Sequence, residues 1–223
     1  MHYRAIATDY DGTLATDGIV APQTWTAIAA FRKQGGQLLL VTGRELTSLQ
    51  QVCPTLDVFD AVVAENGAIV YWPQSGQVSL LGNPPPPEFL DRLQQAGVRN
   101  IHCGRVIVAT WQPHGEVVTN TIAAMQLDYE VILNKRAVMV LPTGVDKALG
   151  LQKAIAELQI PPQQVVGIGD AENDIPLLEV SGLGVAVGNA LPELKTIADA
   201  VMVGERGAGV EELIHQLLDD SFI

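Results

Sequence analysis

Two carboxylates near the N-terminus are the residues best suited to do chemistry. Asp9 and Asp11 follow a short apolar run and precede a Gly-Thr turn at 12–13. Side chains alternate along a strand, so residues two apart begin on the same face. Two like charges this close repel each other, and each loses solvation beside an apolar strand. A bound divalent cation such as Mg²⁺ relieves both costs, whereas a turn with two solvated acids is the alternative reading.

Further polar motifs end other predicted strands. Thr42, Gly43 and Arg44 follow the apolar run that begins at Gln37, and a Gly-Asp-Ala-Glu-Asn-Asp motif at 169–174 follows a run ending at Ile168. In open α/β sheets, ligands bind at the carboxyl ends of the strands. The three motifs are therefore predicted to meet in one crevice. Lys147 opens a predicted helix that could reach the same crevice.

This set of residues suits phosphoryl transfer. Asp9, at a strand end, can attack phosphorus and form an aspartyl-phosphate. Asp11 is placed to protonate the leaving oxygen and then to activate water. Asp170 and Asp174 add carboxylates around a metal, which completes a predicted metal set of Asp9, Asp11, Asp170 and Asp174. Four acids around one phosphate are plausible only if a cation is present.

The predicted phosphate contacts are a hydroxyl, turn N–H groups and a fixed positive charge. Thr42 supplies the hydroxyl, Gly43 an N–H group, and Lys147 the charge at a helix N-terminus. Taken alone, each signal is weak. Lys147 by itself would be a surface lysine, Asp170 and Asp174 could simply favour a helix start, and Arg44 is as typical of an ion pair as of a phosphate site.

The elements that must position these residues alternate between strands and helices, which predicts a doubly wound, parallel, Rossmann-like α/β sheet. Residues 68–81 interrupt the alternation and are predicted to form a hairpin. The predicted strands are 4–9, 37–42, 61–64, 165–168, 184–187 and 200–203. The predicted helices run from Pro22 to Gly35 and over 45–53, 146–158, 173–180, 191–198 and 208–218.

A proline run at 84–87 predicts a domain boundary, because consecutive prolines favour a semi-rigid extended spacer. The predicted core is 1–82 and 143–223, with an inserted smaller α/β domain over 83–142. Within the insert we expect a helix at 88–96, a strand at about 105–111, a helix at 114–127 and strands at 129–134 and 137–141. Its candidate contacts to a substrate are Arg105, Trp111, His114, Lys135 and Arg136. In the core, Glu65-Asn66-Gly67 is expected to shape a turn, and Asn66 could touch substrate.

The overall composition and charge indicate which classes of binding partner are unsuited to this chain. A net charge of −12 and a pI of about 4.6 argue against nucleic acid or an anionic membrane as the main partner. Cys53 and Cys103 lack metal-ligand spacing, which favours a reduced, intracellular protein. The N-terminus does not read as a signal peptide, and no apolar run approaches the roughly 20 residues of a membrane span. We expect a cytoplasmic monomer or small homo-oligomer.

In this order and spacing, the four motifs resemble those of the haloacid dehalogenase (HAD) superfamily of aspartate-nucleophile phosphohydrolases. The resemblance covers the predicted core and implies Mg²⁺ held by Asp9, the backbone carbonyl of Asp11 and Asp170, with Asp174 close by. It also implies phosphate held by Thr42, Lys147 and Asn173. The insert is similar to the C2-type cap of sugar-phosphate and phosphoglycolate phosphatases, which implies a small phosphorylated metabolite as substrate.

One departure from that pattern is Tyr10, where a smaller apolar residue is usual; its side chain is expected to point away from the carboxylates. Two other functions remain open. A phosphomutase would share the aspartyl-phosphate step. A phospho-acceptor signalling domain would use similar residues, but its acceptor aspartate would follow the third strand, where this chain has Glu65, Asn66 and Gly67.

Overall fold

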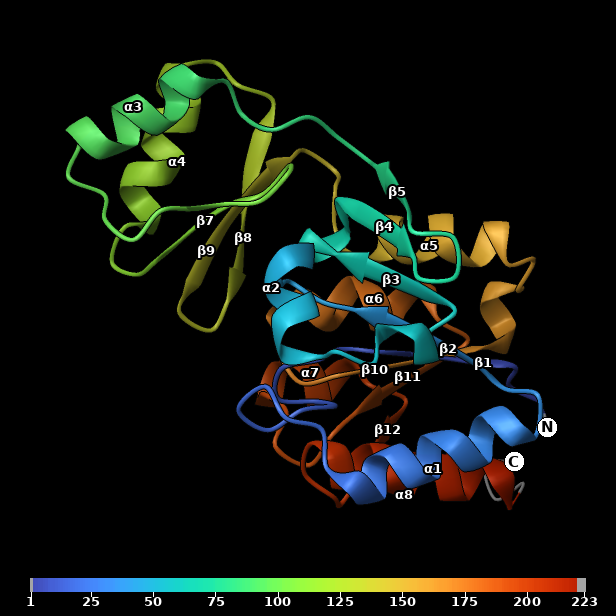
Figure 1. Cartoon of the computed structure of the whole chain (residues 1–223). Coiled ribbons are helices and arrows are strands. Elements are labelled where there is room, and N and C mark those ends of the chain that lie inside the picture. The colour runs from blue at the N-terminus through green and yellow to red at the C-terminus, as the bar shows by residue number, and fades with distance from the viewer. Residues whose placement is uncertain (1, 220–223) are drawn as a thin grey trace.

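The structure, a computed structural model, describes residues 2–219. Within them, eight strands form one central sheet (Figure 1). These are β1 (Ala5–Thr8), β2 (Gln37–Val41), β3 (Ala61–Ala64), β4 (Ile69–Trp72), β5 (Gln77–Leu80), β10 (Val165–Gly169), β11 (Leu183–Ala186) and β12 (Ala200–Val201). Their spatial order is β12-β11-β10-β1-β2-β3-β4-β5.

The sheet is parallel from β12 to β3, and the predicted hairpin of β4 and β5 extends it antiparallel at one edge. β1 lies between β10 and β2, and its four residues are fully buried. Strands covered on both faces are apolar throughout, which explains why β1 and β2 read as continuous apolar runs rather than alternating ones. The carboxyl ends of β1, β2 and β10 therefore lie side by side.

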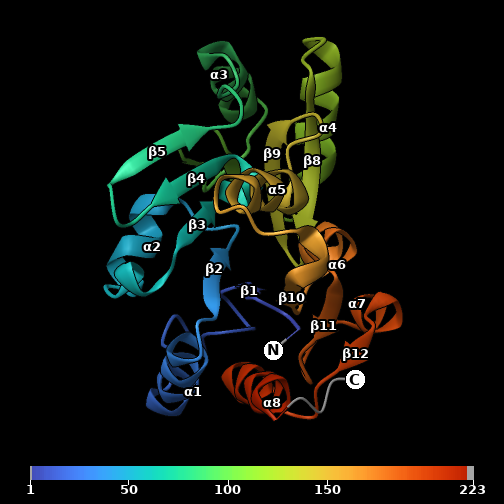
Figure 2. The ribbon, with the colours of Figure 1, turned by 90° about the vertical axis from the view of Figure 1, so that its right-hand side faces the viewer.

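Helices cover both faces of this sheet (Figure 2). On one face lie α1 (Pro22–Lys33) and α8 (Gly207–Leu218), and on the other α5 (Lys147–Glu157) and α6 (Ile175–Val180). The remaining core helices are α2 (Leu46–Val52), α7 (Pro192–Ile197) and the short 3-10 turns η1 (Leu56–Val58), η2 (Glu65–Gly67), η3 (Pro162–Gln164) and η4 (Glu172–Asp174). Proline begins several of these helices, where its fixed φ is already helical and its missing N–H costs nothing.

A second, four-stranded antiparallel sheet lies apart from the first (Figure 1). It consists of β6 (His102–Cys103), β7 (Val108–Trp111), β8 (Tyr129–Asn134) and β9 (Ala137–Pro142), in the order β6-β7-β9-β8. Helices α3 (Pro87–Gln95) and α4 (Gly115–Ala124) cover the face of this sheet that is turned away from the central sheet.

Alternation along β7 and β9 gives the small sheet two different faces. Val108, Val138 and Val140 pack with Phe89 of α3 and Val118 of α4 in a separate apolar cluster. The residues between them along the two strands therefore face the central sheet. This alternation places one row of side chains over the carboxyl end of β1.

The predicted α/β fold, with a doubly wound parallel sheet and an inserted smaller α/β unit, is confirmed. One prediction was wrong: of the strand expected at about 105–111, only 108–111 form a strand (β7), and a turn at 104–107 separates it from β6, a two-residue strand that was not predicted. The helix expected at 173–180 begins with the 3-10 turn η4, and the strand expected at 200–203 ends at Val201. The boundaries of the insert stay a prediction. Over residues 2–219, the helices are too short or too polar to cross a membrane.

Candidate active site

Three carboxylates converge where β1 and β10 end. Asp9 follows β1, Asp170 follows β10, and Asp174 ends the turn η4, so pairing of the two parallel strands brings them together. One oxygen from each lies within 4.8 Å of the other two, and all three residues are buried. Gly12 permits this approach: its φ is 89°, and a Cβ there would lie 2.5 Å from Asp170 Oδ2.

Lys147 is the buried counter-charge of this carboxylate cluster. It is the first residue of α5, and its side chain has no exposure. Its Nζ donates to Asp9 Oδ1 at 2.6 Å and to Asp174 Oδ1 at 2.5 Å. The other oxygen of Asp174 accepts from the backbone N–H groups of Asp170 and Ala171. A buried charge needs such pairing, and the prediction that Lys147 reaches the crevice agrees with this geometry.

Burial dominates the protonation of the cluster. It raises the pKa of Asp9 to about 8, opposed by Lys147 and assisted by Asp174 and Asp170. Burial also raises the pKa of Asp170. For Lys147, burial lowers the pKa, but Asp174 and Asp9 outweigh it and hold the pKa above its usual value. Three buried hard-oxygen donors with two raised carboxyl pKa values suit a divalent cation, which would take the place of the bound proton.

The carboxylate of Asp11 lies outside this cluster, in an ion pair with Arg44. The guanidinium donates through Nε and Nη2 to the two carboxylate oxygens, at 2.5 and 2.7 Å. Its Cζ lies 5.7 Å from the ring centroid of Tyr10, whose hydroxyl donates to the Gly18 carbonyl. Tyr10 therefore lies against the arginine that orients Asp11, whereas from the sequence it was expected to point away from both Asp9 and Asp11.

The Thr42–Arg44 loop lines the site, and two buried asparagines lie behind it, next to Gly43. Thr42 Oγ1 accepts from the backbone N–H of Arg44 at 3.1 Å. Asn173 Nδ2 donates to Asn66 Oδ1 at 2.9 Å, and both side chains are buried. Among the described residues, Asn66 Nδ2 and Asn173 Oδ1 have no hydrogen-bond partner. Buried polar atoms without partners are costly, so these two amides are poised for a polar ligand.

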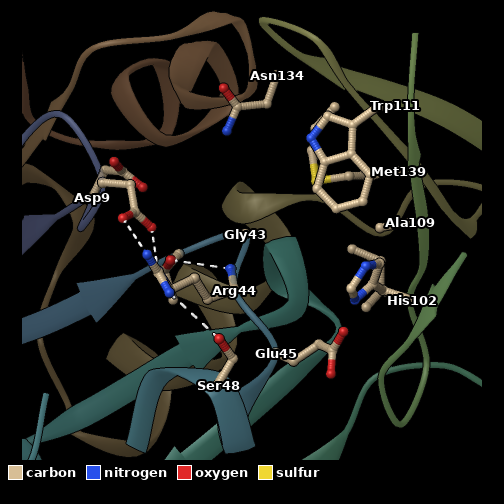
Figure 3. Close-up of a pocket in the computed structure, with 14 residues that line it drawn as sticks. Asp9, Gly43, Arg44, Glu45, Ser48, His102, Ala109, Trp111, Asn134 and Met139 are labelled. Atoms are coloured by element: carbon tan, nitrogen blue, oxygen red, sulfur yellow. Dashed lines mark hydrogen bonds and ion pairs between the residues drawn. The ribbon is translucent and has the colours of Figure 1, made fainter. Parts of the chain in front are cut away.

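A cavity of about 410 Å³ lies between the two sheets, with Asp9 and Asp11 on its wall (Figure 3). The small sheet contributes an apolar and aromatic wall, in which His102 packs edge-on against Trp111. The opposite wall carries the Thr42–Arg44 loop with Glu45 and Ser48. The lining residues are Asp9, Asp11, Thr42, Gly43, Arg44, Glu45, Ser48, His102, Ile107, Ala109, Trp111, Asn134, Ala137 and Met139.

Lys135, at the tip of the β8–β9 hairpin, connects the small sheet to the carboxylates. Its Nζ donates to Asp170 Oδ2 at 2.7 Å, and its backbone N–H donates to Glu172 Oε2 at 3.0 Å. Of the other insert residues considered from the sequence, Trp111 lines the cavity. The cavity lining does not include Arg105, His114 or Arg136.

The structure brings together most of the residues singled out from sequence. Asp9, Lys147, Asp170 and Asp174 form one buried cluster, and Thr42 and Gly43 line the cavity beside it. Asp11 and Arg44 are paired with each other instead of joining the carboxylates. The sequence reasoning missed His102, Ala109 and Met139 as lining residues. Ala109 and Met139 could have been found from the sequence, because they alternate along β7 and β9 with the valines that face the helices.

Comparison with known proteins identifies the class of this site. A profile of haloacid dehalogenase-like hydrolases matches residues 6–97 and 121–214. The chain therefore belongs to the family of haloacid dehalogenase-like hydrolases, as the sequence motifs predicted.

The individual relatives include named phosphatases. A phosphoglycolate phosphatase of Methanopyrus kandleri is 31% identical, with 96% of this chain and 97% of that protein covered. The crystal structure of Thermoplasma acidophilum 0175 matches with a TM-score of 0.84 at 18% identity, covering 97% of this chain and 98% of that one. The structure of the HAD subclass IIB sugar phosphatase BT4131 matches with a TM-score of 0.77 at 18% identity, covering 99% and 100%. The predicted enzyme class, a phosphoric monoester hydrolase, is thereby confirmed.

Proposed function

We propose that the chain is a Mg²⁺-dependent phosphatase that hydrolyses a small phosphorylated metabolite through an aspartyl-phosphate on Asp9. The observation that carries this proposal is the buried cluster of Asp9, Asp170, Asp174 and Lys147, of which Asp9 lines the cavity. The family and the named phosphatases among its relatives support it.

In this proposal Asp9, Asp170 and the backbone carbonyl of Asp11 would hold Mg²⁺, with Asp174 beside them. When bound, the ion would neutralise charge on the non-bridging phosphate oxygens. Lys147 balances the charge of Asp9 and Asp174. We assign the phosphate oxygens to Thr42, the N–H of Gly43, Asn173 and Lys147, and we place Arg44 as the partner of Asp11 instead of a direct phosphate ligand.

The covalent chemistry belongs to two aspartates. An oxygen of Asp9 attacks phosphorus in line, and the bond to the leaving oxygen breaks as Asp11, which must enter this step in its protonated form, donates its proton to that oxygen. Water then attacks the aspartyl-phosphate, Asp11 takes its proton, and Asp9 is released with inorganic phosphate. Arg44 engages one lone pair on each Asp11 oxygen, which leaves a second lone pair for the transferred proton.

The leaving group would occupy the cavity between the two sheets. Its wall from the small sheet is apolar and includes Trp111 and Met139, on which the carbon-rich face of a sugar ring can pack. Arg44 and Lys135, the partly exposed cations beside the carboxylates, are already paired with acids. Within the class of sugar phosphates and phosphoglycolate-like compounds, these features favour a hydroxylated leaving group over a short carboxylate.

We further propose residues 83–142 as a substrate-specificity cap and residues 1–82 and 143–223 as the catalytic core. The separate apolar cluster of the small sheet with α3 and α4 supports this division. Trp111 and Met139 belong to the proposed cap, and Asp9 belongs to the core. The cavity between them would then bind the variable part of the substrate.

A panel of phosphorylated metabolites with and without Mg²⁺ tests the proposal. We expect phosphate release that EDTA abolishes and added Mg²⁺ restores, and no turnover by Asp9→Asn, because an amide is a poor nucleophile. Formation of an isomeric sugar phosphate without phosphate release would indicate a mutase instead. A rate that does not depend on metal, or substantial turnover by Asp9→Asn, would refute the mechanism.

A further inference from the structure

Glu65 joins the insert to the core through a carboxylate that the mechanism does not use. The residue is 1% exposed and lies at the start of the turn η2, after β3. Its Oε1 accepts from the backbone N–H of Arg105 at 2.8 Å. Its Oε2 accepts from those of Val106 and Ile107 at 2.8 and 3.0 Å. A single core carboxylate thus binds three consecutive N–H groups of the insert.

The backbone of the same turn is bonded to the loop that lines the cavity. The N–H of Glu65 donates to the Arg44 carbonyl at 2.9 Å, and that of Asn66 donates to the Thr42 carbonyl at 2.9 Å. The Asn66 side chain accepts from Asn173. Both Glu65 and Asn66 have positive φ, 51° and 54°, a conformation that costs energy for residues other than glycine. The strained turn is therefore held by contacts on both of its sides.

The turn at 104–107 of the insert, whose N–H groups bind Glu65, has room for this carboxylate because residue 104 is a glycine. The N–H of Gly104 closes the turn on the Ile107 carbonyl at 2.9 Å. A Cβ on Gly104 would lie 2.5 Å from Glu65 Cδ, so a residue larger than glycine there would displace the carboxylate. Ile107 itself lines the cavity, and Ala109 of β7 does so two residues later.

We propose that Glu65 is a positioning residue that sets the distance between the insert wall of the cavity and the Thr42–Arg44 loop, and so controls which leaving groups fit. Hydrogen bonds to a charged acceptor are stronger than those between neutral groups, and a buried N–H left without an acceptor is costly. Three such bonds at one point fix Ile107, and through it β7, against the core. The effect on specificity rests on the proposed phosphatase function, whereas the contact itself does not.

Glu65→Gln is the sharpest variant, because it keeps the size of the side chain and replaces one accepting oxygen with a donor. We expect amide hydrogen exchange at 105–107 to rise by about tenfold or more, with exchange in β1 unchanged. With a hexose 6-phosphate we expect KM to rise by about tenfold. With acetyl phosphate, whose leaving group is too small to reach the insert wall, we expect kcat/KM to change by less than about twofold. Glu88→Gln, the same change at an exposed position of α3, is the matched control and should alter none of these.

Gly104→Ala tests the same contact from the insert side and should reproduce the exchange pattern and the KM change. Unchanged exchange at 105–107 in both variants would overturn the proposal. Equal loss of activity on the large and the small substrate would also overturn it, because that result would indicate general damage to the fold. Absence of phosphate release by the unaltered protein would count against the phosphatase function alone, since the exchange measurement needs no substrate.

Discussion

The ammonium group of Lys147 and the carboxylate of Asp9 lie 2.6 Å apart, and no part of the lysine side chain is exposed. Asp174 shares the same ammonium group. The lysine therefore serves two purposes: it opposes the rise that burial causes in the pKa of Asp9, and it keeps positive charge beside the proposed nucleophile. These two purposes can be separated experimentally.

Replacing Lys147 with methionine removes the charge but keeps most of the volume. We expect a loss of stability of about 3–5 kcal/mol in EDTA, because two buried acids lose their counter-charge. We also expect kcat to fall by about 10²-fold or more. Urea unfolding with and without Mg²⁺ measures the first effect, and the metal should recover part of the loss. Lys153→Met, in an exposed pair with Glu157, is the control and should cost less than about 1 kcal/mol. Equal stability losses for the two variants would contradict this role for Lys147.

The affinity for Mg²⁺ should depend on pH. Burial raises the pKa of Asp9 to about 8, so below that pH the metal must displace a proton from the folded protein. Calorimetric titration at pH 6, 7 and 8 should show binding that tightens with pH, with protons released.

The raised pKa of Asp9 has the opposite effect on the stability of the metal-free protein in EDTA, which it favours at low pH and not at high pH. The folded state binds this proton more tightly than the unfolded chain, so the contribution of Asp9 to stability is present at low pH. That contribution is lost as the pH rises from about 4 toward 8. Affinity that is constant over pH 6–8 would contradict this linkage.

Asp11 should matter for proton transfer and little for metal binding. Asp11→Asn is expected to lower kcat by about 10²–10⁴-fold while leaving the Mg²⁺ affinity within about threefold, because the side chain lies outside the carboxylate cluster. Arg44→Lys removes the two-point contact that orients Asp11, and it should lower kcat by a smaller factor of about tenfold. Steady-state rates together with metal titration separate these effects. A large loss of metal affinity in Asp11→Asn would assign its side chain to the metal.

Trp111 should affect the binding of the leaving group and spare the chemistry. The indole lines the cavity on the side opposite Arg44 (Figure 3). Trp111→Ala should raise KM for a hexose 6-phosphate by about tenfold, with kcat on acetyl phosphate nearly unchanged. Trp72→Ala, at a partly buried tryptophan of β4 next to the edge strand β5, provides a comparison for loss of an indole away from the cavity. Equal effects of the two variants on KM would exclude a substrate contact for Trp111.

The core of the site could be predicted from sequence because the carboxyl ends of parallel strands all lie at the same edge of the sheet. Asp9 and Asp170 follow buried apolar runs, and pairing of those runs brings the carboxylates together. Lys147 could be assigned only through its position relative to the other motifs, since a lysine at a helix start is otherwise common. The family comparison confirms the fold and the enzyme class, whereas the roles of these side chains stay predictions.

The insert was harder to interpret, because its contacts are made at long range. The apolar run at about 105–111 predicts a single strand. Glu65, 40 residues earlier, instead binds the N–H groups at 105–107, and the chain turns there. Met139 reads as a core residue, although it lies on the face of β9 that meets the cavity. Arg44 was a candidate for the phosphate, but it is engaged by Asp11, a pairing that sequence spacing alone does not reveal.

The hairpin of β8 and β9 ends in Lys135, while the chain enters and leaves the small sheet at its other end (Figure 1). One end of the insert is thus tethered covalently, whereas the other is attached to Asp170 by opposite charges. Salt screens such an attraction and leaves peptide bonds intact. The contact at the hairpin tip is therefore the part of the attachment between the two sheets that rising salt weakens, whereas the covalent connections at the other end are unaffected.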